Sequence, residues 1–513
     1  MKRTRKSFYN VLMSVLTYGV MLITAFAVQK VLVEVMGSDY NGINGLFGSI
    51  ISMMSLADLG IGTAIIYHMY RPVAEKNRQK VNSLLHFYKS CYIAISGVVL
   101  LIGIVVGFFL PLLVGDVEIA DSIYLIYVLF LADCLSSYFL AYKKSLLYAD
   151  LMNYIPDTIY FMVYMIQNAL QIYVLAAFQS YILFLIVKTM GKCVSNLFIS
   201  LYIGKKYPFT RDRHVEPVEK EVREDIVTKV KGLLCHKLGR ILITGSDSIV
   251  LTGVLGITAM SLYTNYHLII SGIMALLSRI FETLTNSVGN FLLDSDQERR
   301  FDVYQKIDFL NFWCFGCVAA GMYAVLQPLI ALWMGEDFLF DKTVVFVLVV
   351  NFYLEGMRAS VNTFKEAAGI FHEDRRMPMI EAVMNLTVSI ALAKLLGIAG
   401  VFLGTIISTS VAYFYSYPKY VCKPLFGMTY WRYVGMTLKH LAVLLGILGI
   451  TELCTVRMEH WNLWVRMLCG GISAVVIFHA VFLLLYGRCR ELRYYIELFK
   501  RKGQFKQGEE SGD

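Results

Sequence analysis

Ionisable side chains deep inside apolar segments are the strongest chemical feature of this sequence. The segment 227–255 carries the densest set: Lys229, Lys231, His236, Lys237, Arg240 and Asp247. Arg240 lies about 14 residues inside that segment, roughly 20 Å from its start at 1.5 Å per residue. A charge at such depth costs roughly 2.5–3.5 kcal/mol to insert into a bilayer, so it marks a candidate functional site. Because a guanidinium donates paired hydrogen bonds to oxyanions, Arg240 favours a phosphate-like ligand.

Three other apolar segments add charges of both signs. They carry Asp58, Arg279, Glu282, Glu355 and Arg358. In one of them, Glu355, Arg358, Asn362 and Lys365 have the spacing that places side chains on one face of a helix. We expect Arg240, Arg279 and, more weakly, Lys237 to bind an anion in a cavity. We assign coupling or charge balance to Asp58, Glu355, Asp247, Glu282 and Arg358.

A purely structural role for these charges stays open. Arg240 can form a buried pair with Asp247 or Asp58, and Arg279 can pair with Glu282 at i,i+3. The other charged positions can equally be local salt bridges at the ends of the apolar segments.

Motifs for enzymatic chemistry are absent from the sequence. It contains no glycine-rich phosphate loop, no HExxH or histidine cluster, and no GxSxG elbow. We therefore expect a protein that is not an enzyme and has neither a metal nor a cofactor. Its basic residues are dispersed and form no continuous stripe, which argues against a nucleic-acid partner.

Composition identifies the elements that must hold these charges. Of 513 residues, 57% are hydrophobic and 17% are charged, with a mean hydropathy of +0.59, whereas about 25% charged is usual in soluble proteins. At about 20 residues per crossing, hydropathy predicts an all-α polytopic membrane protein with about 14 transmembrane helices. They span 8–36, 42–70, 82–114, 121–147, 152–176, 180–204, 227–255, 258–291, 303–333, 343–369, 376–396, 398–421, 432–454 and 462–486.

The distribution of charge predicts the orientation. Basic residues gather in 2–6, 71–80, 205–213 and 488–506, whereas segments such as 115–121 are acidic or neutral. By the positive-inside rule, both termini are cytoplasmic in the plasma membrane.

A repeat with an offset of about 222 residues predicts the domains. Asp133 matches Glu355, Lys143 matches Lys365 and Pro156 matches Pro378; Val81 matches Val303, and Asp150 lies two residues out of register with Asp374. Six spans separate the copies, so both have the same orientation, as in alternating-access transporters. We expect an N-lobe (1–204, spans 1–6), a cytoplasmic linker (205–226), a pseudo-symmetric C-lobe (227–425, spans 7–12), a helix pair (426–487) and a basic cytoplasmic tail (488–513).

The opening helices resemble those of a known transporter family. The stretches GSDYNGINGLF (37–47) and ISMMSLADLGIGTA (51–64), followed by Tyr70-Arg71-Pro72, resemble Wzx-type polysaccharide flippases of the MOP transporter superfamily. The resemblance implies that undecaprenyl-diphosphate-linked oligosaccharide repeat units are flipped from the cytoplasmic to the outer face by alternating access. A proton or sodium counter-ion would drive this step. A polysaccharide polymerase and glycosyl transferases are the partners considered, for capsule, exopolysaccharide or other surface polysaccharide export.

Three alternatives stay open. A lipid II flippase or a MATE-like drug or metabolite antiporter of the same superfamily would share the fold. A membrane glycosyl transferase or polysaccharide polymerase would belong to another class, although such enzymes tend to carry a sizeable extramembrane region and this sequence has none.

Overall fold

The computed structural model describes residues 2–55, 61–115, 117, 119–212, 215–370 and 373–498, which contain helices and no strands. The helices are α1 (Lys2–Met36), α2 (Ser38–Met54), α3 (Ile61–Ala74), α4 (Arg78–Phe108), α5 (Leu110–Val114), α6 (Ile123–Ser136), α7 (Lys144–Ala149), α8 (Tyr154–Phe178), α9 (Tyr181–Lys206), α10 (Lys220–Leu255), α11 (Ile257–Leu293), α12 (Gln297–Met334), α13 (Lys342–Ala367), α14 (Met377–Val411), α15 (Lys423–Phe426), α16 (Tyr430–Val456) and α17 (Leu463–Tyr486). Short 3₁₀ turns η2 (Ala141–Lys143), η3 (Pro208–Arg211) and η4 (Glu336–Phe338) join some of them, and η5 (Ala412–Cys422) is a π-helix.

Eleven helical segments in this part of the chain are long and apolar enough to cross a membrane. Fourteen spans were predicted, and the difference of three has a structural reason in each case. Span 42–70 is divided between α2 and α3, and α10 carries many charges. The predicted spans 376–396 and 398–421 form one continuous segment of α14 and η5. The predicted all-α polytopic membrane fold is confirmed.

The two halves of α14, before and after Gly397, form a tight antiparallel hairpin. The backbone reverses at Gly397, whose φ of 60° lies in the left-handed region that favours glycine. A Cβ on Gly400 would lie 2.1 Å from the carbonyl oxygen of Leu392, so the two backbones approach as closely as glycine allows. The break predicted between 396 and 398 is therefore a chain reversal.

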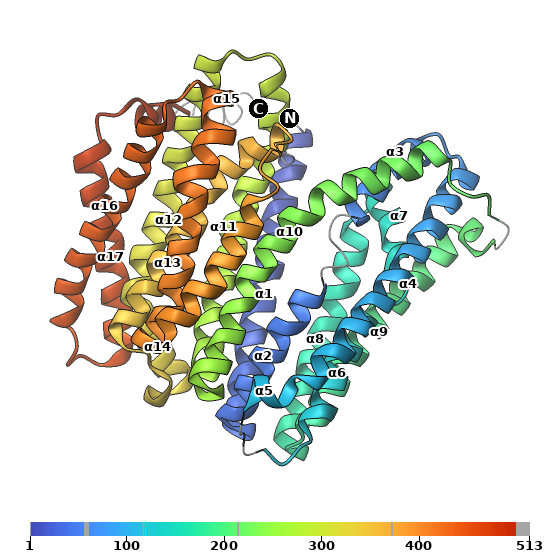
Figure 1. Ribbon diagram of the computed structural model, residues 1–513, viewed down its shortest axis with the longest axis horizontal. Coiled ribbons are helices and arrows are strands. Elements are labelled where there is room, and N and C mark those ends of the chain that lie inside the picture. Colours follow the sequence, from blue (N-terminus) through green and yellow to red (C-terminus); the bar gives the residue numbers. More distant parts are fainter. Residues whose placement is uncertain are drawn as a thin grey trace, which may run out of the picture. The chain divides into compact units, whose positions relative to one another are not determined.

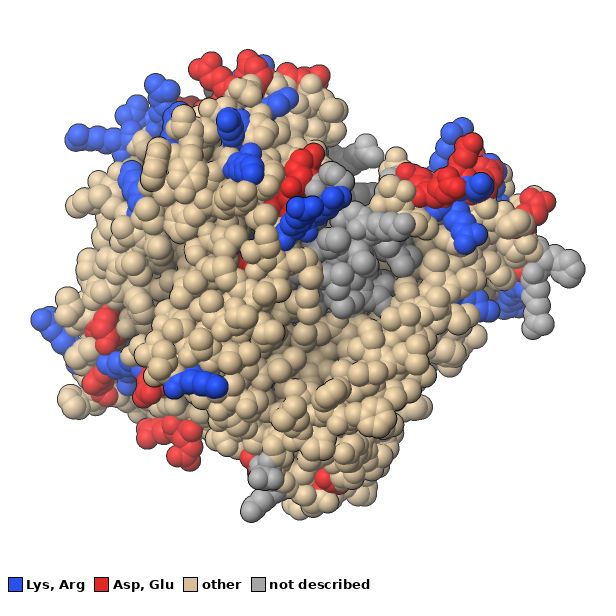
Figure 2. Space-filling model, viewed as in Figure 1, with Lys and Arg blue, Asp and Glu red and all other residues tan. Residues whose placement is uncertain are grey.

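The chain divides into two compact units. Unit 1 comprises Met1–Ile269 and Arg375–Thr405, and unit 2 comprises Ile270–Asp374 and Ile406–Asp513. The repeat-based lobes 1–204 and 227–425, the linker 205–226, the pair 426–487 and the tail 488–513 remain predictions. On the face shown in Figure 2, most Lys, Arg, Asp and Glu side chains lie toward the upper and lower edges, and the surface between them is largely uncharged.

Unit 1 packs α8 against both α1 and α9, and α6 against α9 (Figure 1). Buried amides tie its helices together. Asn41 of α2 donates to the Ser261 carbonyl of α11 at 3.0 Å, and Gln29 of α1 donates to Asn265 of α11 at 3.2 Å. In a membrane protein such bonds satisfy polar groups that lipid cannot.

Within unit 1, polar residues before α10 and at its start contact α3 and α4. Glu219 pairs with Lys80 at 2.8 Å, and Asp225 with His68 at 2.8 Å. Asn82 donates to the carbonyl of Asp212 at 3.2 Å. These contacts place Asp225 against α3, and Glu219 and Asp212 against the start of α4.

Unit 2 is built around α12, which packs against α13, α16 and α17 (Figure 1). Its core is aromatic: Phe312 and Phe315 are fully buried, and Phe478 and Phe482 of α17 pack near Phe312. After α17, residues 490–498 form a further helix, in which Tyr495 donates to the Lys306 carbonyl at 3.0 Å. The first part of the predicted tail is thereby fixed to α12.

Candidate functional site

Three of the predicted site residues cannot be placed by their side chains. Asp58 lies outside the described residues. Lys237 and Arg240 lie in α10, but their side chains are outside the part of the chain that the structure describes. Their predicted roles, and the pairing of Arg240 with Asp247 or Asp58, remain predictions.

Arg279 and Glu282 lie in the second half of α11, within unit 2, and both side chains are exposed. The binding role of Arg279 and its i,i+3 pairing with Glu282 remain predictions.

Asp247 is the centre of a buried oxygen-rich cluster in unit 1. It is 5% exposed, and both of its carboxylate oxygens lie 3.0 Å from the hydroxyl of Thr405. That hydroxyl also accepts from the Asn385 amide at 2.9 Å, and the Ser246 hydroxyl lies 2.6 Å from the Asn385 side-chain oxygen. Next to them, Ser389 donates to the Val401 carbonyl at 2.9 Å.

This cluster has the chemistry of a site for a small hard cation. Carboxylate, amide, hydroxyl and carbonyl oxygens are the ligands that such ions prefer. No lysine or arginine pairs with Asp247 among the ion pairs of the described side chains. A proton or a monovalent cation would neutralise its buried charge. Asn385, Ser389 and Thr405 were missed from sequence, although the i,i+4 spacing of Asn385 and Ser389 in an apolar span was a usable signal.

The predicted polar face of α13 is confirmed, and it contacts the π-helix η5. Arg358 pairs with Glu355 at 3.2 Å and donates to the Tyr417 hydroxyl at 2.9 Å. Tyr417 in turn donates to Asn362 at 3.1 Å. Each acid or amide on this face thus has a partner in unit 2, and the Glu355 side chain is 41% exposed. The charge-balance role of Glu355 and Arg358 remains a prediction.

The repeat positions make corresponding contacts inside each unit. In unit 2, buried Lys365 pairs with Asp374, which accepts from Ser416 of η5 at 2.6 Å. In unit 1, Lys143 donates to Ser200 of α9 at 2.8 Å. Lys143 thus joins the end of the predicted fourth span to the predicted sixth span. Lys365 joins the predicted tenth span to the predicted twelfth span through Asp374.

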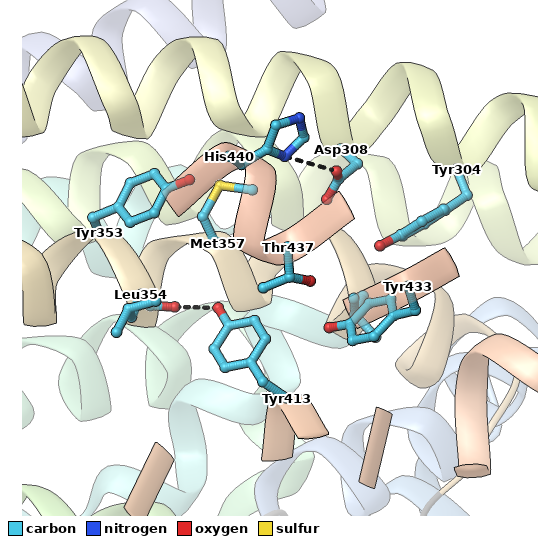
Figure 3. Close-up of a pocket in the computed structure, with 10 residues that line it drawn as sticks. Tyr304, Asp308, Tyr353, Leu354, Met357, Tyr413, Tyr433, Thr437 and His440 are labelled. Carbon is cyan, nitrogen blue, oxygen red and sulfur yellow. Dashed lines mark hydrogen bonds and ion pairs between the residues drawn. The ribbon is translucent and has the colours of Figure 1, made fainter. Parts of the chain in front are cut away.

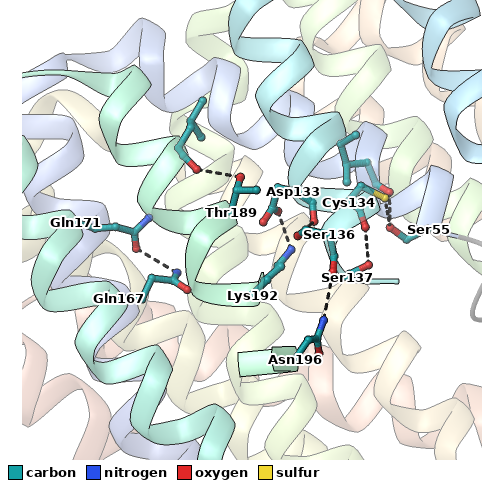
Figure 4. Close-up of polar contacts among 12 residues, drawn as sticks. Ser55, Asp133, Cys134, Ser136, Ser137, Gln167, Gln171, Thr189, Lys192 and Asn196 are labelled. Atoms are coloured by element: carbon teal, nitrogen blue, oxygen red, sulfur yellow. Dashed lines mark hydrogen bonds and ion pairs between the residues drawn. The ribbon is translucent and has the colours of Figure 1, made fainter. Parts of the chain in front are cut away.

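A lysine pair in the middle of unit 1 was missed from sequence. Lys192 of α9 donates to Asp133 of α6 at 2.6 Å (Figure 4), and Lys188, one turn earlier, lies 4.7 Å from the centre of the Phe130 ring. The backbone positions of the two lysines lie about 10–16 Å along α9 from its start, at 1.5 Å per residue. Asp133 pairs with Lys192 and interacts electrostatically with Lys188, so this part of the span carries two basic side chains and one acid. The signal was the i,i+4 spacing of two lysines in an apolar span.

A second missed site lies inside unit 2, around a small cavity (Figure 3). It is lined mainly by aromatic and polar side chains: Tyr304, Asp308, Tyr353, Leu354, Met357, Val361, Tyr413, Tyr433, Thr437 and His440. His440 Nδ1 lies 3.5 Å from Asp308 Oδ2, and Ser360 donates to Asp308 Oδ1 at 2.8 Å. The sequence showed a lone histidine and a lone acid, with no spacing that joined them.

Comparison with known proteins identifies the fold. No family model and no curated protein matches the sequence. An inward-facing multidrug resistance MATE family transporter of the MOP superfamily matches with a TM-score of 0.59 at 13% identity, over 76% of this chain and 92% of that chain. The lipid II flippase MurJ in an inward closed conformation matches with a TM-score of 0.62 at 12% identity, over 93% of this chain and all (100%) of that chain. A Vibrio cholerae MATE transporter variant matches with a TM-score of 0.54 at 14% identity, over 77% of this chain and 91% of that chain. At these identities the likeness is one of fold, and the chain has the fold of MOP-superfamily transporters.

Proposed function

We propose that this protein flips undecaprenyl-diphosphate-linked oligosaccharide repeat units from the cytoplasmic to the outer face of the plasma membrane. The observation that carries the proposal is the lysine pair of α9. Lys188 and Lys192 lie in mid-span, where Lys192 pairs with Asp133 and Lys188 lies over the Phe130 ring. Ionisable side chains inside a membrane span are costly to insert and therefore mark a functional site. Two lysines at this depth suit an anionic headgroup.

The diphosphate would be held by cations of the first repeat copy together with those predicted from sequence. Lys188 and Lys192 join Arg240, Arg279 and Lys237 in this role. Polar side chains close to the lysine pair, such as Gln167 and Asn196 (Figure 4), supply donors and acceptors of the kind that sugar hydroxyls need.

Ion coupling is assigned to the Asp247 cluster. Neutralising Asp247 with a proton or sodium ion removes the free-energy cost of a buried charge. It therefore favours the conformation in which Asp247 is buried. Transport then requires that substrate and ion bind the alternating conformations with different affinities. Asp58, Glu355, Glu282 and Arg358 balance the charge of the empty cavity.

The proposed orientation places both termini in the cytoplasm, where the basic segments meet the anionic inner leaflet. The same orientation puts the polar segment before α10 on the side where glycosyl transferases complete the glycolipid. A polysaccharide polymerase on the outer face would consume the product.

A lipid II flippase is the second candidate, and one observation favours it. The structural match to MurJ covers 93% of this chain. The cationic span and the Asp247 cluster suit either glycolipid, because both carry a diphosphate.

The test is deletion of the gene in its host, followed by fractionation of lipid-linked oligosaccharides by side of the membrane. Accumulation of complete repeat units on the cytoplasmic face with loss of surface polymer supports the proposal. Accumulation of lipid II on that face with intact polymer supports the second candidate. Truncated glycolipids would instead indicate a transferase, and normal glycolipids with altered drug sensitivity would indicate an antiporter.

A further inference from the structure

We propose that Asp308 and His440 form a proton-binding site within unit 2, separate from the Asp247 cluster of unit 1. Both side chains are buried, with exposures of 5% and 7%. They project from α12 and α16 toward the same small cavity (Figure 3).

The pair has hydrogen-bonding capacity that the described residues leave unused. Asp308 Oδ1 accepts from Ser360 at 2.8 Å and the Tyr304 hydroxyl is a further donor to this carboxylate, whereas Oδ2 lies 3.5 Å from His440 Nδ1. His440 Nδ1 and the Tyr353 hydroxyl, both buried and both lining the cavity, have no hydrogen-bond partner among the described residues. The cavity has room for about one water molecule, which can bridge these groups and carry a proton between them and the surroundings.

Charge accounting identifies the ligand as a proton. An isolated buried carboxylate is strongly disfavoured, and here it has no lysine or arginine within ion-pair distance in the described chain. With one proton bound, the pair is neutral overall whether the proton lies on Asp308 or on His440. Losing that proton would leave an uncompensated charge, so the two groups bind and release it as a unit.

The other titratable groups around the pair do not replace that proton. Each neighbouring element contributes neutral phenols or a thiol: Tyr304 from α12, Tyr353 from α13, Tyr413 and Cys422 from η5, Tyr433 from α16 and Tyr486 from α17. The nearest cation on α16, Lys439, places its ammonium 4.9 Å from the centre of the Tyr486 ring. Ring stacking of His440 on Phe312, with centres 4.5 Å apart, holds the imidazole toward Asp308.

The position of the site connects it to transport, and this step rests on the proposed function. Asp308 and His440 lie about 8 and 12 Å inside the predicted inner boundaries of their spans, at 1.5 Å per residue. A proton taken up there, together with a cation at Asp247, would give the transporter two coupling sites, one in each unit.

The test begins with proton binding, which needs no substrate. Infrared difference spectra of the purified full-length protein in lipid nanodiscs, recorded between mildly acidic and mildly alkaline pH, report the C=O stretch of protonated carboxyl groups. We expect a band that Asp308→Asn removes and His440→Gln shifts. The matched control is Asp302→Asn, because Asp302 lies on the same helix, is exposed, and pairs with Lys306 at 2.6 Å; it should leave the band unchanged.

Two results would overturn the proposal. One is a spectrum in which neither a carboxyl band assignable to Asp308 nor an imidazolium band assignable to His440 responds to pH, or in which His440→Gln leaves the Asp308 band unaffected. If Asp308→Asn fails to fold, His440→Gln is measured instead in protein labelled with ¹³C-aspartate. The label identifies the aspartate carboxyl band, and its shift in His440→Gln shows whether the carboxyl group is coupled to His440. The other is unchanged dependence of glycolipid flipping on a pH gradient in proteoliposomes of Asp308→Asn. Wild-type protein that binds the proton but flips no glycolipid would count against the proposed function alone.

Discussion

Lys192 Nζ lies 2.6 Å from Asp133 Oδ2 and joins α9 to α6 in the middle of unit 1. The second carboxylate oxygen of Asp133 is buried with no partner among the described residues. Asp133 therefore has capacity for a second donor, and Lys188 one turn away is the nearest cation along α9. A diphosphate entering here would compete with this acid for both lysines.

We expect Lys188→Met to lower glycolipid flipping about tenfold, because a hydrogen bond to a charged group contributes about 1.5–3 kcal/mol. Flipping is measured in inside-out vesicles, with the amount of membrane protein quantified in parallel. Lys205→Met, at the exposed end of the same helix, is the control and should leave flipping unchanged. A parallel loss of folded protein in Lys188→Met would indicate a structural role.

We expect Arg240→Ala to abolish flipping without loss of protein from the membrane, because a guanidinium at that depth is assigned to the diphosphate. Arg240→Lys should retain part of the activity, since it keeps the charge but loses the paired donors. Equal loss of activity and of folded protein in Arg240→Ala would instead support the buried pair with Asp247 or Asp58.

Thr405→Val tests the Asp247 cluster. It removes the hydroxyl between Asp247 and Asn385, so both lose a partner and the free energy of unfolding should fall by about 1–3 kcal/mol. Thermal melts with and without sodium measure this effect, and any stabilisation by sodium should disappear with it. Thr387→Val is the control, because its hydroxyl bonds only the backbone of its own helix and it is exposed.

Gly400→Ala should strongly reduce the yield of folded protein. The added Cβ would lie 2.1 Å from the Leu392 carbonyl oxygen, and backbone cannot move aside as a flexible side chain can. Gly449→Ala in α16 has open space around the new methyl group and should be neutral or slightly stabilising. Size-exclusion profiles measure this: the monodisperse peak should be much smaller than wild type for Gly400→Ala and unchanged for Gly449→Ala.

Protein stability should fall at acidic pH because Lys342, at the start of α13, loses its ion pair with Glu459. The hydrogen bond from Lys342 holds the pKa of Glu459, in the loop before α17, below its usual range. A lowered folded-state pKa stabilises the protein at neutral pH, and this stabilisation is lost as the pH falls through that pKa. In Lys342→Met, the Glu459 contribution to the decrease in melting temperature at acidic pH should disappear. A melting curve with the same pH profile as wild type would contradict the assignment.

Hydropathy was sufficient to predict the fold, because about 20 apolar residues per crossing is a local property. It even located the reversal at Gly397. The polar clusters were harder, since their members lie on helices far apart in sequence and meet only through the rotation of each helix about its axis. Asp308 and His440 illustrate this limit, whereas the polar face of α13 follows one helix and was predicted.

The Gly397 hairpin also bears on how the protein enters the membrane. Asn385, Ser389, Val401 and Thr405 pair with one another across the hairpin, so most ligands of the Asp247 cluster come from a single stretch of 21 residues (385–405). During synthesis, the two halves can leave the translocon together, with these polar groups already satisfied by each other. The cluster would then exist before the rest of the C-terminal chain is made, and α10, inserted earlier, would need only to offer Asp247 to it.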